Sequence, residues 1–492
     1  MRPSIDLTRA EGNAALQEKH PFARRGFFSG FVVALSILHW IILVFHIPVL
    51  TWIVWWFWKF TDTPLEALWI APCLAAILLI WLKYSLPKPE KNILMIAGLI
   101  VLGYAMQMGF GYIEGRGIDG IRYRMVTSGH SAFAQYAVMQ DSLVDTIRNY
   151  EEKLEEFDRR GLDTWGRSKP PGTLLLYMLT DRLANAVTGP RKGEERLHNL
   201  RTLASYLWPL LSYLVLFPLY LFTSRYVNRD AGFMACVLYI LIPSVTLMPL
   251  HTDQTFFPLF AMVALYLSAV AAERNSTALG IVSGVWCYLI LFSTFSLLFI
   301  IPLILLTPLG MNVQLGWLDR LRLIMKQSAI FLGGFVGCDL LFRFLFSYDI
   351  IARFQGAMHN HVSWKHWDFS FFHVSHSAAI NLIEFALWVG IPVTLLASHR
   401  VYRSMKGFNP YKMDVSSTLS LGLLLVVIAL NILGQAKGET ARLWLFLVPF
   451  VCVIAAHSLI RLERTEGRFF VSVVLTSQWI TILLTKMNQD FY

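Results

Sequence analysis

Long apolar stretches alternate with short polar segments along most of the chain. Because a helix needs about 20 apolar residues to cross a bilayer, the pattern predicts about thirteen transmembrane helices. The predicted spans are residues 27–50, 65–84, 92–112, 202–224, 231–249, 254–272, 277–291, 296–310, 327–347, 379–398, 416–433, 443–460 and 469–485. We therefore predict an all-α polytopic membrane protein.

One pair of these spans has a second interpretation. Residues 277–291 and 296–310 are either two spans or one long helix broken near Ser293 and Thr294. In the second case every later loop changes sides, and Arg400, Arg403 and Lys406 lie outside. The positive-inside rule disfavours that arrangement, so we predict two spans.

The charged residues sort to opposite faces when the spans alternate in direction. Lys and Arg gather in the short loops of one face, which the positive-inside rule makes cytoplasmic together with the N-terminus. The chain is 56% hydrophobic and 15% charged, and soluble domains average about 25% charged. We attribute the net charge of +10 to loops beside anionic lipid and expect no nucleic-acid partner.

The longest polar segment, residues 113–201, is predicted to lie on the outer face. Within it, residues 141–160 predict a helix in the aqueous phase with Asp141 as N-cap. Residues 172–188 predict an amphipathic helix on the membrane surface; a further span is the alternative. We predict two parts: residues 1–91, a cytoplasmic N-terminus with two spans, and residues 92–492, a membrane core that includes this loop.

Carboxylates and arginines follow the third predicted span closely. Glu114 and Asp119 are candidates for a general base, and Arg122 and Arg124 for binding an anionic group. His130 is a further candidate for substrate binding. The alternative is a solvated, salt-bridged loop.

Three more polar groups stand near the outer ends of other spans. Lys169 precedes Pro170 and Pro171, whose rings stiffen the backbone and would hold its ammonium group where it can neutralise a phosphate. His251 and Asp253 lie between two spans, and ionisable groups at membrane depth are usually functional. The alternative for each is a plain turn or a helix cap.

Glu439 and Arg442 stand three residues apart before the twelfth predicted span, so on a helix they share a face and can pair. At the outer face the two groups can bind hydroxyl or phosphate oxygens; the alternative is a salt bridge that caps the span. Arg343, inside the predicted span 327–347, is a further candidate for a buried charge.

No residue pattern requires a metal or another cofactor. The five cysteines lie in apolar stretches, and no two have metal-ligand spacing. Segment 348–378 contains His359, His361, His373 and His376, but histidines mixed with tryptophans also suit sugar stacking or the membrane interface. A divalent metal is compatible with the sequence but is not indicated by it.

These motifs resemble those of GT-C class membrane glycosyltransferases, which use polyprenyl-phosphate sugars. Residues 92–112 are similar to the first core span of that class and residues 113–201 to its first outer loop. Ser168-Lys-Pro-Pro-Gly172 resembles its His/Lys-Pro-Pro element, and His251-Thr-Asp253 and Gly438-Glu-Thr-Ala-Arg442-Leu-Trp resemble elements of a bacterial subgroup. This chain has Lys169 at the position where that subgroup usually has histidine. It also lacks the pair of adjacent acidic residues that is common in the class.

The resemblance implies an inverting transfer at the extracytoplasmic face of the bacterial cytoplasmic membrane. Asp119, or Glu114, would deprotonate the acceptor hydroxyl, while Lys169, Arg122 and Arg442 would hold the departing lipid phosphate. The donor would be a polyprenyl-phosphate sugar among the membrane lipids, and the acceptor a glycan, a lipid or a protein. The alternatives are a transporter or flippase for a lipid-linked or anionic substrate, and an oligosaccharide ligase or polymerase.

Overall fold

The structure is a computed structural model that describes residues 26–48, 59–60, 62–63, 65–85, 92–113, 115, 119–120, 122, 131–161, 165–247, 253–311, 315–434, 436 and 438–490. In these residues the regular structure is helical apart from one two-residue antiparallel ladder, in which β1 (Lys59–Phe60) pairs with β2 (Gln489–Asp490). The prediction of an all-α fold is confirmed for this part of the chain.

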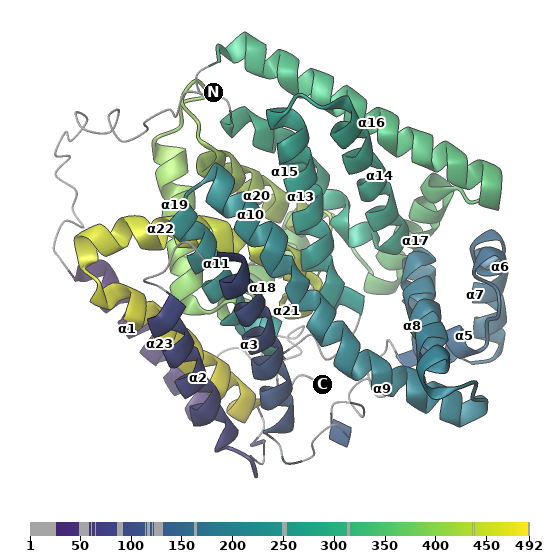
Figure 1. The fold of residues 1–492 in the computed structure, drawn as a ribbon, viewed down its shortest axis with the longest axis horizontal. Helices are drawn as coiled ribbons and strands as arrows, with labels where there is room; N and C mark the ends of the chain where they lie inside the picture. Colours follow the sequence, from purple (N-terminus) through teal and green to yellow (C-terminus); the bar gives the residue numbers. More distant parts are fainter. Residues whose placement is uncertain are drawn as a thin grey trace.

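Two groups of helices lie at opposite sides of the molecule (Figure 1). One group consists of α1 (Phe27–Val44), α2 (Ile70–Ser85), α3 (Asn92–Tyr112) and α23 (Phe469–Asn488). The other holds the helices of the predicted outer loop, which are α5 (Ser131–Val138), α6 (Leu143–Arg148), α7 (Tyr150–Arg159), the short 3-10 helix η2 (Trp165–Ser168), α8 (Gly172–Thr188) and the start of α9 (Gly193–Ser212).

The remaining elements form the rest of the molecule, with α16 along its edge (Figure 1). They are η3 (Tyr213–Val215), α10 (Leu216–Tyr226), α11 (Arg229–Ile240), α12 (Pro243–Leu247), η5 (Asp253–Phe256), α13 (Phe257–Glu273), α14 (Thr277–Ser293), η6 (Phe295–Ile300), α15 (Ile301–Leu306), η7 (Thr307–Gly310), α16 (Trp317–Phe346), α17 (Ile350–Lys365), α18 (Phe371–Val389), α19 (Ile391–Lys406), α20 (Val415–Ile432), α21 (Thr440–Leu443), η8 (Leu445–Leu447) and α22 (Val448–Glu466). α22 runs through the core, since 83% of its most apolar window is buried.

Eight helical segments of the described chain are long and apolar enough to cross a membrane, or nine if the bent pair α18 and α19 is one span. The eight are Phe27–Val44, Ile93–Tyr112, Gly193–Tyr226, Gln254–Glu273, Trp317–Phe346, Val415–Ile432, Leu445–Glu466 and Phe469–Asn488. The chain is thus a multi-pass membrane protein, but the predicted thirteen spans are not confirmed. Three predicted spans correspond to shorter apolar helices, and those at 231–249 and 379–398 are broken.

The arrangement of α14 and α16 decides between the two interpretations of residues 277–310. A Cβ on Gly284 of α14 would lie 2.0 Å from the Phe331 carbonyl oxygen of α16, so the two backbones touch. Further along both helices, the rings of Tyr288 and Phe292 pack against Phe342 at 5.0 and 5.1 Å. The contacts pair low residue numbers of α14 with low numbers of α16 and high with high, so the two helices run in the same direction. Residues 295–310 must then run back in the opposite direction between them, as two separate spans require.

The predicted span 379–398 is wrong as a continuous helix. α18 ends at Val389 and α19 begins at Ile391, with a bend of 117° between them. Gly390 has a left-handed backbone (φ 91°), and Pro392 in the first turn of α19 lacks the N–H that a continuous helix would use. The reversal brings one face of α18 beside the segment that precedes α22.

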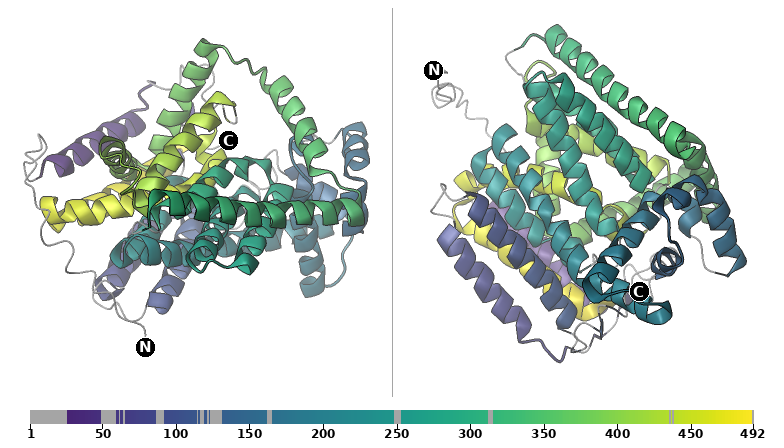
Figure 2. Two further views of the ribbon diagram at one scale, coloured as in Figure 1. Left: turned by 90° about the horizontal axis from the view of Figure 1, so that it is seen from above. Right: turned by 45° about the vertical axis from the view of Figure 1, so that its right-hand side comes forward.

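The outer helices follow the prediction with two differences. α8 covers the predicted surface helix, residues 172–188, and is not among the candidate spans. The segment 141–160 is broken at Asn149 into α6 and α7, and Ser142 rather than Asp141 caps α6, since its hydroxyl accepts the Asp145 N–H. These helices lie beside the end of α16 (Figure 2). Arg148 of α6 donates a hydrogen bond to the Leu345 carbonyl (2.9 Å).

Candidate functional site

A cavity of about 240 Å³ lies where five distant segments of the chain meet. They are the turn before α8, the start of α13, the break after α14, one face of α17 and the segment that leads into α22. Its polar lining consists of Ser168, Lys169, Gln254, Thr294, Ser296, His361, Glu439 and Arg442. Lys169, Glu439 and Arg442, singled out separately in the sequence, therefore line one space.

Neighbouring helices fix the turn that carries Lys169. Asn360 of α17 donates a hydrogen bond to the Ser168 hydroxyl (2.8 Å), and the Tyr150 hydroxyl of α7 lies 3.3 Å from the Lys169 carbonyl oxygen. Burial raises the pKa of Tyr150, so its phenol stays neutral and can donate to that carbonyl. The ammonium group of Lys169 lies 5.1 Å from the centre of the Phe133 ring.

The start of α8 is also pressed against the end of α14. A Cβ on Gly172 would come within 2.5 Å of the Phe292 carbonyl oxygen, and the Thr173 hydroxyl donates to the Ser293 carbonyl (2.9 Å). The Pro-Pro-Gly motif therefore allows a close backbone approach that a larger residue at position 172 would prevent.

Glu439 and Arg442 form the ion pair that their spacing predicts, with 2.9 Å between Arg442 Nη2 and Glu439 Oε2. Glu439 adopts the left-handed backbone region (φ 61°) directly after Gly438 (φ 76°). A non-glycine residue there costs on the order of 1–3 kcal/mol, and such residues cluster at functional sites. The strained residue places a half-exposed carboxylate beside a guanidinium at the cavity wall.

Two buried residues of α18 hold this strained segment. The Asn381 side-chain amide donates to the Asn431 Oδ1 (2.9 Å) and the Ala436 carbonyl (2.8 Å), and its Oδ1 accepts the Gly438 N–H (2.8 Å). One turn later, Glu384 accepts the Thr440 N–H (3.1 Å). The sequence analysis missed both, although two polar residues three apart in an apolar run are a signal for a shared polar face.

Gln254, which directly follows the His251-Thr-Asp253 motif, lines the same cavity. Its side chain is 4% exposed, and its Oε1 has no hydrogen-bond partner among the described residues. Leaving a buried acceptor unsatisfied costs roughly 1–3 kcal/mol unless water or a ligand supplies a donor. Gln254 therefore adds a buried amide to the wall that carries the two cations.

The predicted base Asp119 lies apart from this lining. Its carboxylate is exposed and pairs with Arg122, whose Nη1 lies 2.8 Å from His198 Nε2 and 3.4 Å from the Thr202 hydroxyl on α9. Asp119 is therefore not among the described residues that line the cavity, and its role as base stays a prediction.

Other predicted site residues fall outside the described part of the chain. They are Glu114, Arg124, His130 and His251, and for Asp253 the backbone is described as the start of η5 but the side chain is not. Their roles remain predictions.

Metal ligation and buried charge were the remaining possibilities raised by the sequence. Among the described residues, no three His, Cys, Asp or Glu side chains are grouped so that they could hold a metal ion. His361 instead bonds to the Gly434 carbonyl (3.0 Å), and His373 pairs with Asp368 (3.2 Å). Arg343 forms ion pairs with Asp339 (2.8 Å) and Asp349, so two carboxylates balance its positive charge.

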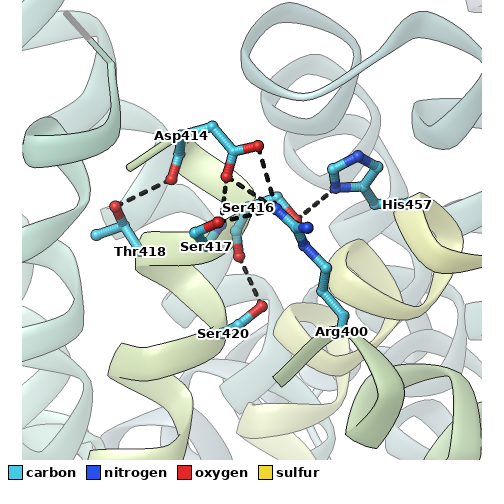
Figure 3. Close-up of polar contacts among 7 residues, drawn as sticks. All are labelled: Arg400, Asp414, Ser416, Ser417, Thr418, Ser420 and His457. Carbon is cyan, nitrogen blue, oxygen red and sulfur yellow. Dashed lines mark hydrogen bonds and ion pairs between the residues drawn. The ribbon is translucent and has the colours of Figure 1, made fainter. Parts of the chain in front are cut away.

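Figure 3 shows a second polar cluster, at the start of α20. The cavity lies at the other end of this 18-residue helix, which is roughly 27 Å long. Arg400 donates to Asp414 (2.9 Å), Ser416 (2.8 Å) and Ser417 (2.9 Å), and His457 contacts the Ser416 hydroxyl. Burial works against the charge of Asp414, but Arg400 and Ser417 hold its pKa below the ordinary value. The cluster caps α20 with partnered groups and is structural.

Comparison with solved structures gives a likeness of fold, whereas the other comparisons give no match. No protein-family model and no curated protein matches the chain. Among solved structures, the chain is similar to the Archaeoglobus fulgidus oligosaccharyltransferase in complex with Zn and sulfate, with 14% identity and a TM-score of 0.48. The match covers 79% of this chain and 52% of that one, so the chain spans about half the length of that protein.

Proposed function

We propose that the chain is a GT-C-like membrane glycosyltransferase that binds the phosphate of a lipid-phosphate sugar, by resemblance a polyprenyl phosphate, in the cavity of Lys169 and Arg442. The observation that carries the proposal is the convergence of these two cations with Glu439 on one cavity. Two cations beside an apolar wall suit a phosphate whose lipid chain stays in the membrane. That the lipid phosphate carries a sugar is inferred from the motif resemblance alone.

The proposed step is an inverting displacement at the anomeric carbon. A carboxylate takes the proton of the acceptor hydroxyl, the acceptor oxygen bonds to that carbon, and the bond from the carbon to the phosphate oxygen breaks. Lys169 and Arg442 stabilise the electron pair that stays on the lipid phosphate. Glu439 is the base in this proposal because it lines the cavity, and Asp119 is the alternative.

The proposed site lies on the extracytoplasmic side. α22 begins beside the cavity and ends in Arg461 and Arg464, and α19 ends in Arg403 and Lys406 at the far end from the reversal at Gly390. Basic loops remain cytoplasmic, which favours a cavity on the opposite face. By resemblance, the membrane is the bacterial cytoplasmic membrane and the acceptor a glycan, lipid or protein.

Mass spectrometry of membrane glycans and glycolipids tests the proposal. Removal of the chain should abolish one glycoconjugate, and wild-type protein but not Lys169→Ala or Arg442→Ala should restore it. Loss of either cation should lower transfer by about 10²–10³-fold, as for removal of a group that stabilises a developing charge. Substrate flux across sealed vesicles without a covalent product would instead indicate a transporter, and transfer of a preformed chain en bloc would indicate a ligase.

A further inference from the structure

Arg353 of α17 is a buried cation that the proposed reaction does not use. Its side chain is 5% exposed, whereas that of its carboxylate partner Glu151 is 66% exposed. Its Nη1 donates to both Glu151 oxygens (2.7 Å), but its Nε has no described partner. Burying a charge costs several kcal/mol, and a well-packed apolar residue is often as stable or more so. Stability alone therefore does not explain an arginine at this position.

The same guanidinium contacts the turn that carries Lys169. Its Nη2 donates a hydrogen bond to the Arg167 carbonyl, two residues before Lys169. Its Cζ lies 5.8 Å from the centre of the Tyr150 ring, whose hydroxyl in turn lies beside the Lys169 carbonyl. Because a guanidinium is planar and rigid, its bonds to Glu151 and Arg167 fix that carbonyl relative to α7. Arg353 thus contacts the turn directly and also through Tyr150.

α17 connects these contacts to the cavity. Asn360, two helical turns after Arg353 on the same face, donates to the Ser168 hydroxyl (2.8 Å), so one face of α17 holds two successive residues of the turn. The neighbouring face lines the cavity, for example through His361. The place of Lys169 at the cavity wall therefore depends on how α17 holds the turn.

We infer that Arg353 is a positioning residue, which acts through this turn to hold Lys169 at the cavity wall. Arg353 is not among the residues that line the cavity, so it does not bind the phosphate itself. The effect on a lipid phosphate rests on the proposed function, whereas the effect on the position of Lys169 does not.

Nuclear magnetic resonance of the full-length protein in nanodiscs, with its lysines methylated by isotope-labelled formaldehyde, tests the position without a ligand. The Lys169 signals are those that Lys169→Arg deletes. Because the ammonium group lies 5.1 Å from the centre of the Phe133 ring, they should carry a ring-current shift that Phe133→Leu removes. Arg353→Lys keeps a positive charge beside Glu151 but lacks the planar fork, so the Lys169 signals should move toward those of exposed lysines. Arg353→Gln is the second variant and should shift them in the same direction.

Native mass spectrometry with polyprenyl phosphate tests the consequence for binding. Arg353→Lys should weaken binding by roughly threefold to tenfold, the effect of one lost hydrogen bond. It should have no further effect in the Lys169→Ala background, because it acts through that side chain; a merely structural role would weaken binding in both backgrounds. Arg343→Lys is the matched control, since Arg343 pairs with Asp339 and Asp349 at the elbow before α17, and it should change neither the signals nor the affinity.

The inference is overturned if Arg353→Lys and Arg353→Gln leave the Lys169 signals unchanged, or if Arg343→Lys shifts them as much. It is also overturned if Arg353→Lys weakens binding equally with and without Lys169, or leaves the binding of the wild type unchanged. Failure of the wild type to bind polyprenyl phosphate would contradict the proposed function, and the methyl signals would still decide whether Arg353 positions Lys169.

Discussion

Asn381 is the residue whose removal should most clearly show that α18 holds the Glu439 segment in place. It is fully buried and makes three hydrogen bonds of 2.8–2.9 Å to Asn431, Ala436 and Gly438. Asn381→Leu keeps the volume but removes all three. At about 1 kcal/mol net for each bond, and more where a partner stays unsatisfied, the loss of unfolding free energy should be about 3–5 kcal/mol.

Ser377 provides the control on the same helix, one turn earlier. It is also fully buried, but its hydroxyl has no hydrogen-bond partner among the described residues. Ser377→Ala should therefore leave stability unchanged or raise it slightly. The assay is thermal unfolding of both variants in the same detergent, followed by tryptophan fluorescence, with transfer activity measured alongside.

Asn381→Asp keeps an acceptor for the Gly438 N–H but turns its second oxygen toward the Asn431 Oδ1 and the Ala436 carbonyl, so it should also lower the melting temperature. Equal melting temperatures for Asn381→Leu and Ser377→Ala would refute the reasoning, because the network would then contribute nothing.

Three further predictions concern the base, the second polar cluster and the helix contact. Glu439→Gln should lower transfer by about 10²–10⁴-fold, the usual contribution of a general base, and Asp119→Asn much less; the opposite order in a radiolabelled-donor assay would move the base to Asp119. Asp414→Asn should lower the melting temperature at pH 7. Because the pKa of Asp414 is depressed in the folded protein, its carboxylate stabilises the fold above about pH 4, and this stabilisation is lost as the pH falls through the folded pKa. A difference in melting temperature between wild type and variant that grew below about pH 4 would contradict this. Gly284→Val should destabilise the protein because a Cβ there meets backbone at 2.0 Å, whereas Gly333→Val, with nothing within 4 Å, should not; equal melting temperatures would disprove the contact.

The helices were largely predictable because membrane helices need long apolar runs, which are visible in any window. The break at Gly390 was missed even though Gly390 and Pro392 mark it, because the apolar run continues through both. Hydropathy averages over such a break and cannot register a change of direction. The positive-inside rule predicted a separate span at residues 296–310, and the contacts of Gly284 and Phe292 with α16 agree with that direction.

The candidate site was predictable only in part. Lys169 and the Glu439–Arg442 pair stood out because proline stiffening and three-residue spacing are local signals. That they share a cavity depends on long-range packing of α17 and α18. The density of charge near Asp119 made it the first choice of base, but a local density does not determine which distant segment it meets.

The central claim, that Lys169 and Arg442 together bind a lipid phosphate, is tested most directly by the affinity of the purified protein for polyprenyl phosphate. Native mass spectrometry in nanodiscs can compare wild-type protein with Lys169→Ala, Arg442→Ala and the double variant. The account predicts saturable binding that each single variant weakens by roughly tenfold or more, as for a lost charge-assisted bond. Equal binding by all four proteins, or no binding by the wild type, would contradict it.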